Sequence, residues 1–399
     1  MREQPNIILI TIDCLRADHC GWLNPEKREL TPFLNKLAKE SLVFTNAYST
    51  GPNTYLSFPG ILTGTYPLSF KGWDGKTFPG LDQRPYLPEI LQKNGYFTVA
   101  ILDNSYISSF FGYDRGFEIF KDLSLLKKPL LSQSKSIWEK GFQKINLFQW
   151  HFKLKKFLFD KTPRVYNFLK SLITFLRRFY ISSGSSASGI NEATIEEMRF
   201  SDGAWFLWIH YMDLHEPYWL PDEFLHSNRV TKREMNAVNS LFFPKLIFLS
   251  SIIMKRKTKI ELLRKIYQLE VKYLDDQIKN LLSQLKDKLE NTLIIITADH
   301  GQLLGENGQV GHFPASFKKL FKVPLIMKIP NIPPKTINKP VSLAQIPSTI
   351  LKLVGIKAPP EMEPSLFEEN NKVYSEWTIF SPFLDTFDLK NYQKIVWKK

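Results

Sequence analysis

Carboxylate and imidazole side chains that could bind a metal ion follow three apolar runs of the chain. The runs are residues 6–13, 203–213 and 291–301, and the polar residues at their ends are Asp13, Asp213 with His215, and Asp299 with His300. A single acidic residue in such a place is commonly a helix cap, but three such ends, two of them with a histidine, favour a shared site. Because carboxylates and imidazoles together suit Zn²⁺, Mn²⁺ or a similar ion, the pattern predicts a divalent-metal site.

The three runs have the continuous apolar character of strands that are buried on both faces of a parallel sheet. Further strands are predicted at residues 43–49, 97–104 and 323–330, and helices at 31–41, 86–96, 258–288 and 342–355. The helix at 31–41 is expected to begin with Thr31 as its cap, because a proline follows it. Alternating strands and helices indicate an α/β fold with a mostly parallel central sheet and helices on both faces. Ligands bind beyond the carboxyl ends of the strands in such folds, so the three polar ends are expected to meet.

The net charge of +14 is concentrated in one part of the chain. Residues 121–180 contain 14 lysines and arginines against three acidic residues, so they carry +11 of that charge. Within them, residues 142–180 interleave apolar and basic positions in the manner of amphipathic helices. We expect these helices to cover the domain or a second copy of the chain, and the alternative is peripheral contact with an anionic membrane surface or glycan. No nucleic-acid-binding motif accompanies the charge, so nucleic acid is not expected as a partner.

Cysteine content and hydropathy indicate the compartment. The two cysteines, Cys14 and Cys20, provide no disulfide framework and favour a reducing environment. The uncharged run 41–70 is rich in Gly, Pro, Asn, Ser and Thr, and the apolar run 246–254 is short, whereas a membrane-spanning helix needs roughly 20 apolar residues. The apolar run that follows Arg2 and Glu3 is too short and wrongly flanked for a signal peptide, so none is expected. A cytoplasmic protein, at most peripheral at the membrane surface, is therefore expected.

The order and spacing of several motifs resemble the sulfatase family of the alkaline phosphatase superfamily. The motifs are PNIILITIDCLRADHCGW, TPFLNKLAKESLVFTNAYS, ILTGTYP, GYDRGFEIF, FLWIHYMDLHEPY and TADHGQLLGENGQVGH. The resemblance covers residues 4–120 and 189–377. It implies a sulfatase-like catalytic domain at residues 1–335, which contains the basic helical insert 121–188, and a shortened C-terminal subdomain at residues 336–399.

The resemblance also implies the position of a nucleophile. In that family the nucleophile touches the metal from the start of a helix, ten residues before the glycine of an LTG sequence, and this count from Gly64 leads to Thr54. Sulfatases proper carry a cysteine there, which is converted to formylglycine within Cys-x-Pro-Ser-Arg. This chain reads TYLSF at residues 54–58, so it cannot form formylglycine at this position, and Cys14 replaces the second acid of the usual Asp-Asp pair. Both departures resemble the phosphoryl branches of the superfamily, which use a metal-bound threonine and a single early carboxylate.

The remaining roles follow from the same resemblance. The first cation, which could be Mn²⁺, Zn²⁺, Mg²⁺ or Ca²⁺, would be held by Asp13, Thr54, Asp299 and His300. His215 and His312 would contact the transferred group, and Asn53 and Asn104 would bind substrate. One cation is favoured over two, and in the alternative a second site is formed by Asp213, His215 and His312.

Three functions remain to be weighed against one another. The first is metal-dependent hydrolysis of a phosphoester, above all a phosphodiester, or transfer of a phosphoryl group through Thr54. The second is a sulfatase that works without formylglycine, and the third is a sulfatase-like binding protein without turnover. For either enzyme the substrate is expected to be an ester of a small molecule, a glycan or a lipid headgroup, and a homo-oligomer is compatible with the basic insert.

Overall fold

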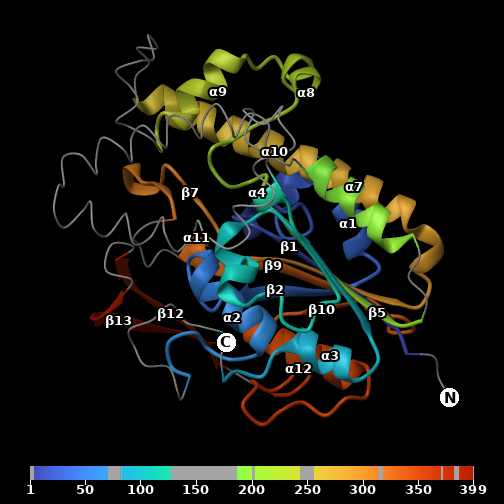
Figure 1. Cartoon of the computed structure of the whole chain (residues 1–399). Helices are drawn as coiled ribbons and strands as arrows, with labels where there is room; N and C mark the ends of the chain where they lie inside the picture. Colours follow the sequence, from blue (N-terminus) through green and yellow to red (C-terminus); the bar gives the residue numbers. More distant parts are fainter. Residues whose placement is uncertain are drawn as a thin grey trace, which may run out of the picture.

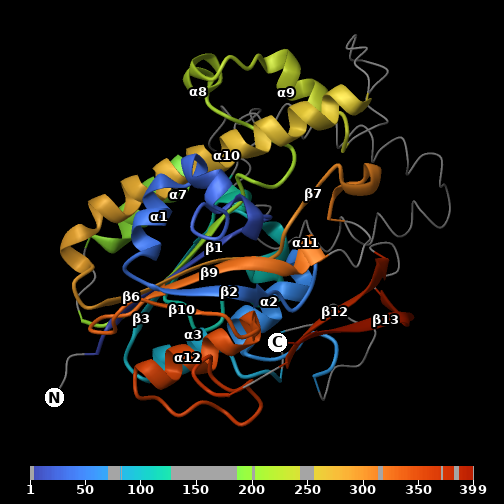
Figure 2. The same ribbon diagram turned by 180° about the vertical axis from the view of Figure 1, so that it is seen from behind.

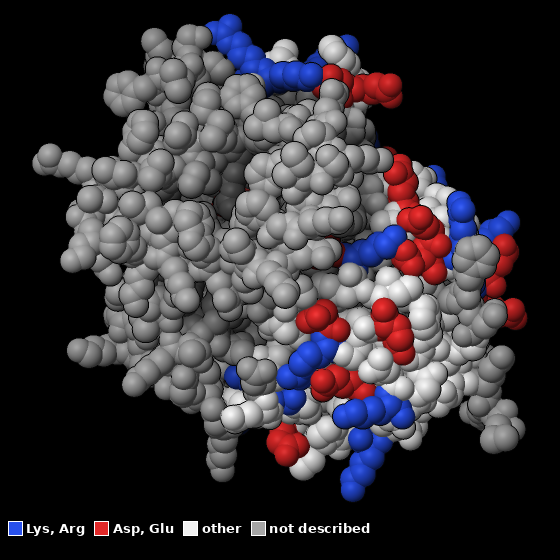
Figure 3. Space-filling model, in the orientation of Figure 1, with Lys and Arg blue, Asp and Glu red and all other residues white. Residues whose placement is uncertain are grey.

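The computed structural model of the chain describes residues 4–70, 81, 83–126, 187–199, 203–242, 256–312, 318–369, 372–381 and 386–398. The amphipathic helices predicted within residues 142–180 lie outside the described residues, so their role stays a prediction. None of the described helices is long and apolar enough to cross a membrane. On the face drawn in Figure 3, acidic and basic side chains of the described residues lie interspersed, so they form no single-sign patch there.

A central sheet of nine described strands runs through the molecule in the order β10-β2-β9-β6-β1-β5-β3-β4, and β11 also pairs with β2 (Figure 1). The strands are β1 (Asn6–Ile12), β2 (Leu42–Tyr48), β3 (Phe97–Leu102), β4 (Ile119–Asp122), β5 (Trp205–Tyr211), β6 (Thr292–Ala298), β9 (Lys322–Lys328), β10 (Lys335–Ile337) and β11 (Val341–Ser342). All pairings are parallel except those of β9, which runs antiparallel to both β2 and β6. The predicted mostly parallel sheet is confirmed.

The three strands that carry the predicted polar ends are neighbours at the centre of the sheet. β1 pairs with β5 on one side and with β6 on the other, with Ile12 opposite Tyr211 and Ala298. Every residue of β5 and β6 is buried, as is every residue of β1 after Asn6. Because all three strands run in the same direction, the residues that follow them emerge at one edge.

Helices cover both faces of the sheet, as Figures 1 and 2 show from opposite sides. One face carries α1 (Pro32–Ala38), α7 (Ala187–Met198) and the long α10 (Arg256–Gln284), with α8 (Asp222–Ser227) and α9 (Lys232–Asn239) beyond them. The other face carries α2 (Thr54–Thr63), α3 (Leu87–Lys93) and α12 (Ile346–Leu353). The remaining described elements are α4 (Leu123–Leu126), α11 (Lys318–Phe321) and the small pair β7 (Leu303–Leu304) and β8 (Val310–Gly311).

The N-terminus of α1 is capped by a residue from another helix. Thr31 occupies the predicted cap position and a proline follows it, but its side chain makes no capping hydrogen bond. The buried carboxylate of Asp275 in α10 instead accepts from the backbone N–H groups of Phe33 and Leu34 at 2.8 and 2.9 Å. Free N–H groups at a helix start favour an anion, and here the tertiary structure supplies it.

A hairpin near the end of the chain, β12 (Lys372–Ser381) and β13 (Thr386–Lys398), was not predicted from the sequence. It packs against the segment that leads from β2 into α2. Ser375 Oγ donates to the carbonyl oxygen of Ser49 at 2.6 Å, and the backbone N–H of Glu376 donates to that of Thr50 at 2.7 Å. The hairpin therefore supports the loop just before Thr54. The division of the chain into domains 1–335 and 336–399 stays a prediction. β10 and β11, which lie at and just after that boundary, both pair with β2 of the main sheet.

Candidate active site

Two carboxylates reach the site from neighbouring strands. Asp13 directly follows β1 and Asp299 directly follows β6, and the two strands are in register, so both side chains leave the sheet at the same point. Both carboxylates are completely buried, and together with His300 they place ligand atoms within 4.8 Å of one another. The structure thus brings together three of the residues predicted to hold the first cation.

Thr54 completes this group from the opposite direction. It is the first residue of α2, and its hydroxyl lies 3.3 Å from Asp13 Oδ2 and 3.2 Å from Asp299 Oδ2. Asn53 is the cap of the helix, and its side-chain oxygen accepts from the backbone N–H of Leu56 at 3.2 Å. The cap and the helix N-terminus place partial positive charge around the Thr54 oxygen, which favours negative charge on it.

The hydrogen bonds around His300 test whether a cation fits this group. His300 Nδ1 lies 2.9 Å from the carbonyl oxygen of Gly301, so Nδ1 donates to that oxygen and Nε2 is the ring nitrogen left to face the carboxylates. Nε2 faces Asp299 Oδ2 at 3.4 Å and Asp13 Oδ1 at 3.7 Å. Among the described residues, neither His300 Nε2 nor Asp13 Oδ1 has a hydrogen-bond partner, although both are buried. Buried polar atoms without a partner that face one another in this way leave a place that a cation would fill, so these residues fit a divalent metal.

The titration of the two carboxylates points the same way. Burial raises the pKa of Asp299, and the neighbouring Asp13 adds to the rise. Burial also opposes ionisation of Asp13, but His215, His210 and His300 outweigh it and hold its pKa well below the usual range. Two buried carboxylates at this distance cannot both ionise cheaply without a counter-charge. A dication would provide that charge.

Two further side chains orient Asp13. Asn104 donates from Nδ2 to Asp13 Oδ2 at 3.3 Å, and its predicted contact with substrate stays a prediction. His210 places Nε2 at 3.5 Å from the same oxygen, while its Nδ1 contacts Thr11 Oγ1 at 3.0 Å. His210 was not among the site residues predicted from the sequence. The register of β1 with β5, in which His210 lies opposite Thr11, is the signal that would have identified it.

A second group of side chains lies beside the first. His215, Glu216 and His312 place ligand atoms within 4.8 Å of one another, and the rings of His215 and His312 are 5.1 Å apart. Gln302 links them, since its Nε2 donates to Glu216 Oε2 at 2.6 Å and its Oε1 lies 3.1 Å from His312 Nδ1. Glu216 and Gln302 were not predicted from the sequence, because neither follows a strand directly.

Asp213 does not join this group. Its Oδ1 accepts from the backbone N–H of Ala187 at 2.9 Å, at the first residue of α7. Asp213 belongs to none of the candidate metal groups that the described residues form. The second site predicted from Asp213, His215 and His312 is therefore corrected. The chain turns after β5 so that the Asp213 carboxylate accepts from the start of a helix while His215 lies beside His312.

The two histidines of the second group differ in charge. Burial lowers the pKa of His312 well below its usual range, and the nearby His300 and His215 lower it further, so His312 is neutral. Burial also opposes protonation of His215, but Glu216, Asp13 and Asp299 outweigh it and raise its pKa. The pKa values of these two neighbouring histidines are therefore shifted in opposite directions, although their rings are in contact.

An ion network joins the loop after β1 to the loop after β6. The buried guanidinium of Arg16 donates to Glu306 Oε1 and pairs with Asp18 Oδ2, each at 2.6 Å, and it also donates to the carbonyl oxygen of Gln302 at 3.2 Å. Partial burial raises the pKa of Glu306, but Arg16 outweighs it and lowers this pKa to about 2. The network holds Gln302 where it can contact His312.

Glu306→Gln is expected to reduce the free energy of unfolding by ~1–2 kcal/mol at pH 7, a value discounted for the partial exposure of the carboxylate. Because the folded-state pKa is depressed, this stabilisation is present above the ordinary pKa near 4.5 and is lost as the pH falls toward about 2. Denaturant unfolding at a series of pH values would measure it. Glu261→Gln, at an exposed position of α10, serves as the control, and a pH-independent difference between Glu306→Gln and wild type would contradict the expectation.

Known proteins show the same fold and sequence pattern. The family model described as Sulfatase matches residues 5–356. Arylsulfatase K of Canis lupus familiaris is 22% identical over 373 residues, which span 89% of this chain and 64% of that protein. A protein named Sulfatase from Formosa agariphila is 24% identical over 382 residues, which span 89% of this chain and 70% of that protein. The chain thus covers less than two thirds of the length of the first of these relatives.

A solved structure extends the comparison. The phosphonate monoester hydrolase from Silicibacter pomeroyi superposes with a TM-score of 0.66 at 20% sequence identity and covers 98% of this chain and 85% of its own. At this identity the likeness shows the fold, and the family model adds the ordered motifs across most of the sequence. The chain therefore belongs to the sulfatase family.

Proposed function

We propose that the chain is a metal-dependent hydrolase or transferase that acts on a phosphoester, above all a phosphodiester, through a covalent intermediate on Thr54. The observation that carries the proposal is the Thr54 hydroxyl, which lies at the N-terminus of α2 within 3.3 Å of both buried carboxylates. A threonine in this place excludes formylglycine chemistry at residue 54. It leaves an alcohol as the nucleophile, which suits phosphoryl transfer.

Asp13, Asp299 and His300 would hold the cation, which when bound lowers the pKa of the Thr54 hydroxyl and neutralises charge on the phosphoryl oxygens. The helix N-terminus adds to the stabilisation of the Thr54 oxyanion. His215, whose pKa the surrounding carboxylates raise, would contact the transferred group, while Asn104 and His210 keep Asp13 in its orientation. Each of these roles rests on side chains that lie around Asp13, whose carboxylate the Thr54 hydroxyl contacts.

In the first step Thr54 Oγ would form a bond to phosphorus while the bond from phosphorus to the leaving oxygen breaks. The hydroxyl proton of Thr54 leaves to solvent, and the departing alkoxide takes one proton to become an alcohol. In the second step a water oxygen forms a bond to phosphorus and the bond to Thr54 Oγ breaks. The neutral His312 can accept a proton from that water, and Thr54 regains its proton. In a transferase an acceptor alcohol replaces the water.

The names of the relatives favour a second candidate. Arylsulfatase K and the Formosa protein are named as sulfatases, and a sulfate ester resembles a phosphoester in shape and in the oxygens that a cation would bind. Sulfate ester hydrolysis by Thr54, without formylglycine, is therefore the alternative reaction. The substrate in either case would be an ester of a small molecule, a glycan or a lipid headgroup.

One experiment separates these functions. The purified protein would be assayed with aryl phosphodiester, phosphomonoester, phosphonate monoester and sulfate substrates in the presence of Mn²⁺, Zn²⁺, Mg²⁺ or Ca²⁺. We expect phosphodiester turnover that EDTA abolishes and added cation restores. Turnover of sulfate esters without turnover of phosphodiesters would contradict the proposed reaction. Binding of cation without turnover of any ester would favour the non-catalytic alternative.

A further inference from the structure

The side chain of Gln302 lies between two loops of the site. Gln302 is completely buried, and Arg16 holds its backbone, because the guanidinium donates to the carbonyl oxygen of Gln302 at 3.2 Å. The side-chain amide contacts Glu216, from the loop after β5, and His312, which directly follows β8. The steps proposed above give this amide no part in the reaction.

The neighbours of the amide determine which way it faces. A carboxylate accepts hydrogen bonds and donates none, so the amide nitrogen must face Glu216 Oε2, which lies 2.6 Å from Nε2. The hydroxyl of Tyr218, at 3.4 Å, is a second acceptor for that nitrogen. The amide oxygen therefore faces the other way, where it lies 3.1 Å from His312 Nδ1. The reverse orientation would press the amide oxygen against the Glu216 carboxylate.

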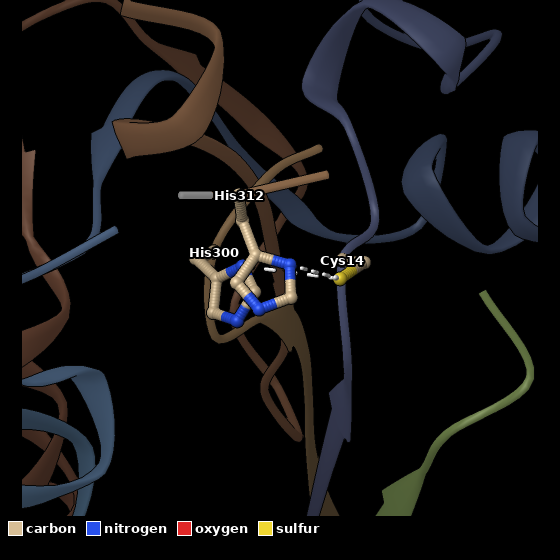
Figure 4. Close-up of side chains that lie close together, drawn as sticks. All are labelled: Cys14, His300 and His312. Carbon is tan, nitrogen blue, oxygen red and sulfur yellow. Dashed lines mark hydrogen bonds between the residues drawn. The ribbon is translucent and has the colours of Figure 1, made fainter. Parts of the chain in front are cut away.

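This orientation determines which ring nitrogen of His312 carries a proton. An amide oxygen only accepts, so His312 Nδ1 must be the donor. Cys14 Sγ lies 3.9 Å from the same nitrogen, as Figure 4 shows, but a thiol is a weaker partner than an amide oxygen, and the oxygen is closer. The thiol also faces Gln302 Oε1 itself, at 3.7 Å. In a neutral imidazole with its proton on Nδ1, Nε2 keeps a lone pair and can accept a proton.

We infer that Gln302 is a positioning residue: held by Glu216, it keeps the ring proton of His312 on Nδ1 and leaves Nε2 as the basic nitrogen. The ring of His312 lies 4.8 Å from that of His300 and 5.1 Å from that of His215, so it borders the carboxylate group. The inference deepens the proposed function and rests on it for the use of His312 as the base that takes a proton from water. Gln302 and Glu216 then act on the reaction only through His312.

Nitrogen NMR spectra of the full chain with ¹⁵N-labelled histidine test the inference without any turnover. A protonated ring nitrogen and one with a lone pair resonate far apart, so the spectra identify the tautomer. The chain contains seven histidines, and the signals of His312 are those that disappear in His312→Gln. In buffer with Mg²⁺ we expect the wild type to carry the His312 proton on Nδ1. A proton on Nε2, alone or together with one on Nδ1, would overturn the inference.

Loss of the amide or of its carboxylate partner is expected to move the proton. Gln302→Met keeps the length of the side chain but offers no acceptor, so we expect a proton on His312 Nε2. We also expect kcat for phosphodiester hydrolysis to fall by ~10–100-fold with little change in KM, which is part of the ~10²–10⁴-fold that a general base contributes. Glu216→Gln lets the amide of Gln302 face either way, so both tautomers and a smaller fall in kcat are expected.

An exchange of the two side chains provides the rescue. In the double variant Glu216→Gln with Gln302→Glu, the carboxylate at position 302 can accept both from the amide at position 216 and from His312 Nδ1. We therefore expect the proton to stay on Nδ1 and kcat to exceed that of Gln302→Met by ~10-fold. A His312 without a proton on Nδ1 in this double variant would overturn the inference.

Gln345→Met is the matched control for a purely structural effect. Gln345 is also buried, but its amide makes hydrogen bonds to Ser342 and Pro364 rather than to a site residue. We expect this substitution to lower the free energy of unfolding and to leave the His312 signals and kcat unchanged. A change of the His312 tautomer in this variant would show that loss of any buried amide moves the proton, and it would overturn the role of Gln302.

Failure of this inference can be told apart from failure of the proposed function. If the wild type carried the His312 proton on Nε2, phosphodiester turnover that depends on Thr54 would still support the proposed function. The spectra decide the inference even if no ester is turned over. If Gln302→Met does not fold, the spectra of the wild type and of the double variant still decide.

Discussion

Thr54→Ala is expected to lower kcat for phosphodiester hydrolysis by at least ~10³-fold, because it removes the atom that bonds to phosphorus. The hydroxyl contacts both Asp13 and Asp299, and no other hydroxyl is placed on these carboxylates by the described residues. Thr54→Ser keeps the oxygen and is expected to retain most of the turnover. Steady-state kinetics with an aryl phosphodiester at saturating cation would measure both variants.

Thr63→Ala is the matched control for that experiment. Thr63 lies at the other end of the same helix and is also buried. Its hydroxyl donates to the carbonyl oxygen of Pro59, so the substitution removes a hydrogen bond that lies away from the site. We expect it to cost ~1 kcal/mol of stability and to leave kcat unchanged. Full activity in Thr54→Ala would show that the nucleophile is misassigned.

Asp299→Asn is expected to abolish stabilisation by the cation and, at the same time, to stabilise the metal-free protein. In the wild type without cation, the ionised Asp299 carboxylate is buried beside Asp13, and burial has raised its pKa to about 6. Above that pH the charge destabilises the fold, so the neutral amide should raise the free energy of unfolding by ~1–2 kcal/mol at pH 7. The variant, by contrast, lacks one ligand of the cation and should gain no stability from it. The free energy of unfolding of the wild type should rise by ~2.7 kcal/mol at a cation concentration 100 times Kd.

Thermal unfolding with EDTA and with added Mn²⁺ or Zn²⁺ would measure both effects. Asp276→Asn is the control, because this carboxylate lies at an exposed position of α10 and should change neither value. If Asp299→Asn responded to cation as strongly as the wild type, Asp299 would not be a ligand. If the variant were less stable than the wild type without cation, the buried Asp299 charge would not destabilise the metal-free fold as we infer.

The strands that carry the first metal group could be predicted from the sequence alone. The apolar runs that end at Asp13 and Asp299 have the length and the continuous apolar character of buried strands. The structure confirms them as β1 and β6. The family resemblance located Thr54 through its spacing from Gly64, which closes α2 with a φ of 69°. These features are local, because a buried strand and a helix stop are encoded by residues next to one another.

The hairpin β12–β13 could not be predicted in the same way. Its sequence mixes charged, polar and aromatic residues, and its place depends on contacts with distant segments. One such contact stacks Trp397 on Tyr48 of β2 with ring centroids 4.4 Å apart. Contacts between residues so far apart in the chain leave no periodic signal in either segment. The support that the hairpin gives to the loop before Thr54 was therefore visible only in the structure.

The sequence by itself determined which residue types stand at the ends of the strands and that Thr54, rather than a cysteine, begins α2. Only the tertiary structure decided which of these residues meet. It placed β1 between β5 and β6, turned Asp213 away to the start of α7, and turned the Cys14 thiol inward through a positive φ. The physical reason is that strand order and backbone turns depend on packing over the whole chain, whereas the apolar pattern of a strand specifies only its own burial.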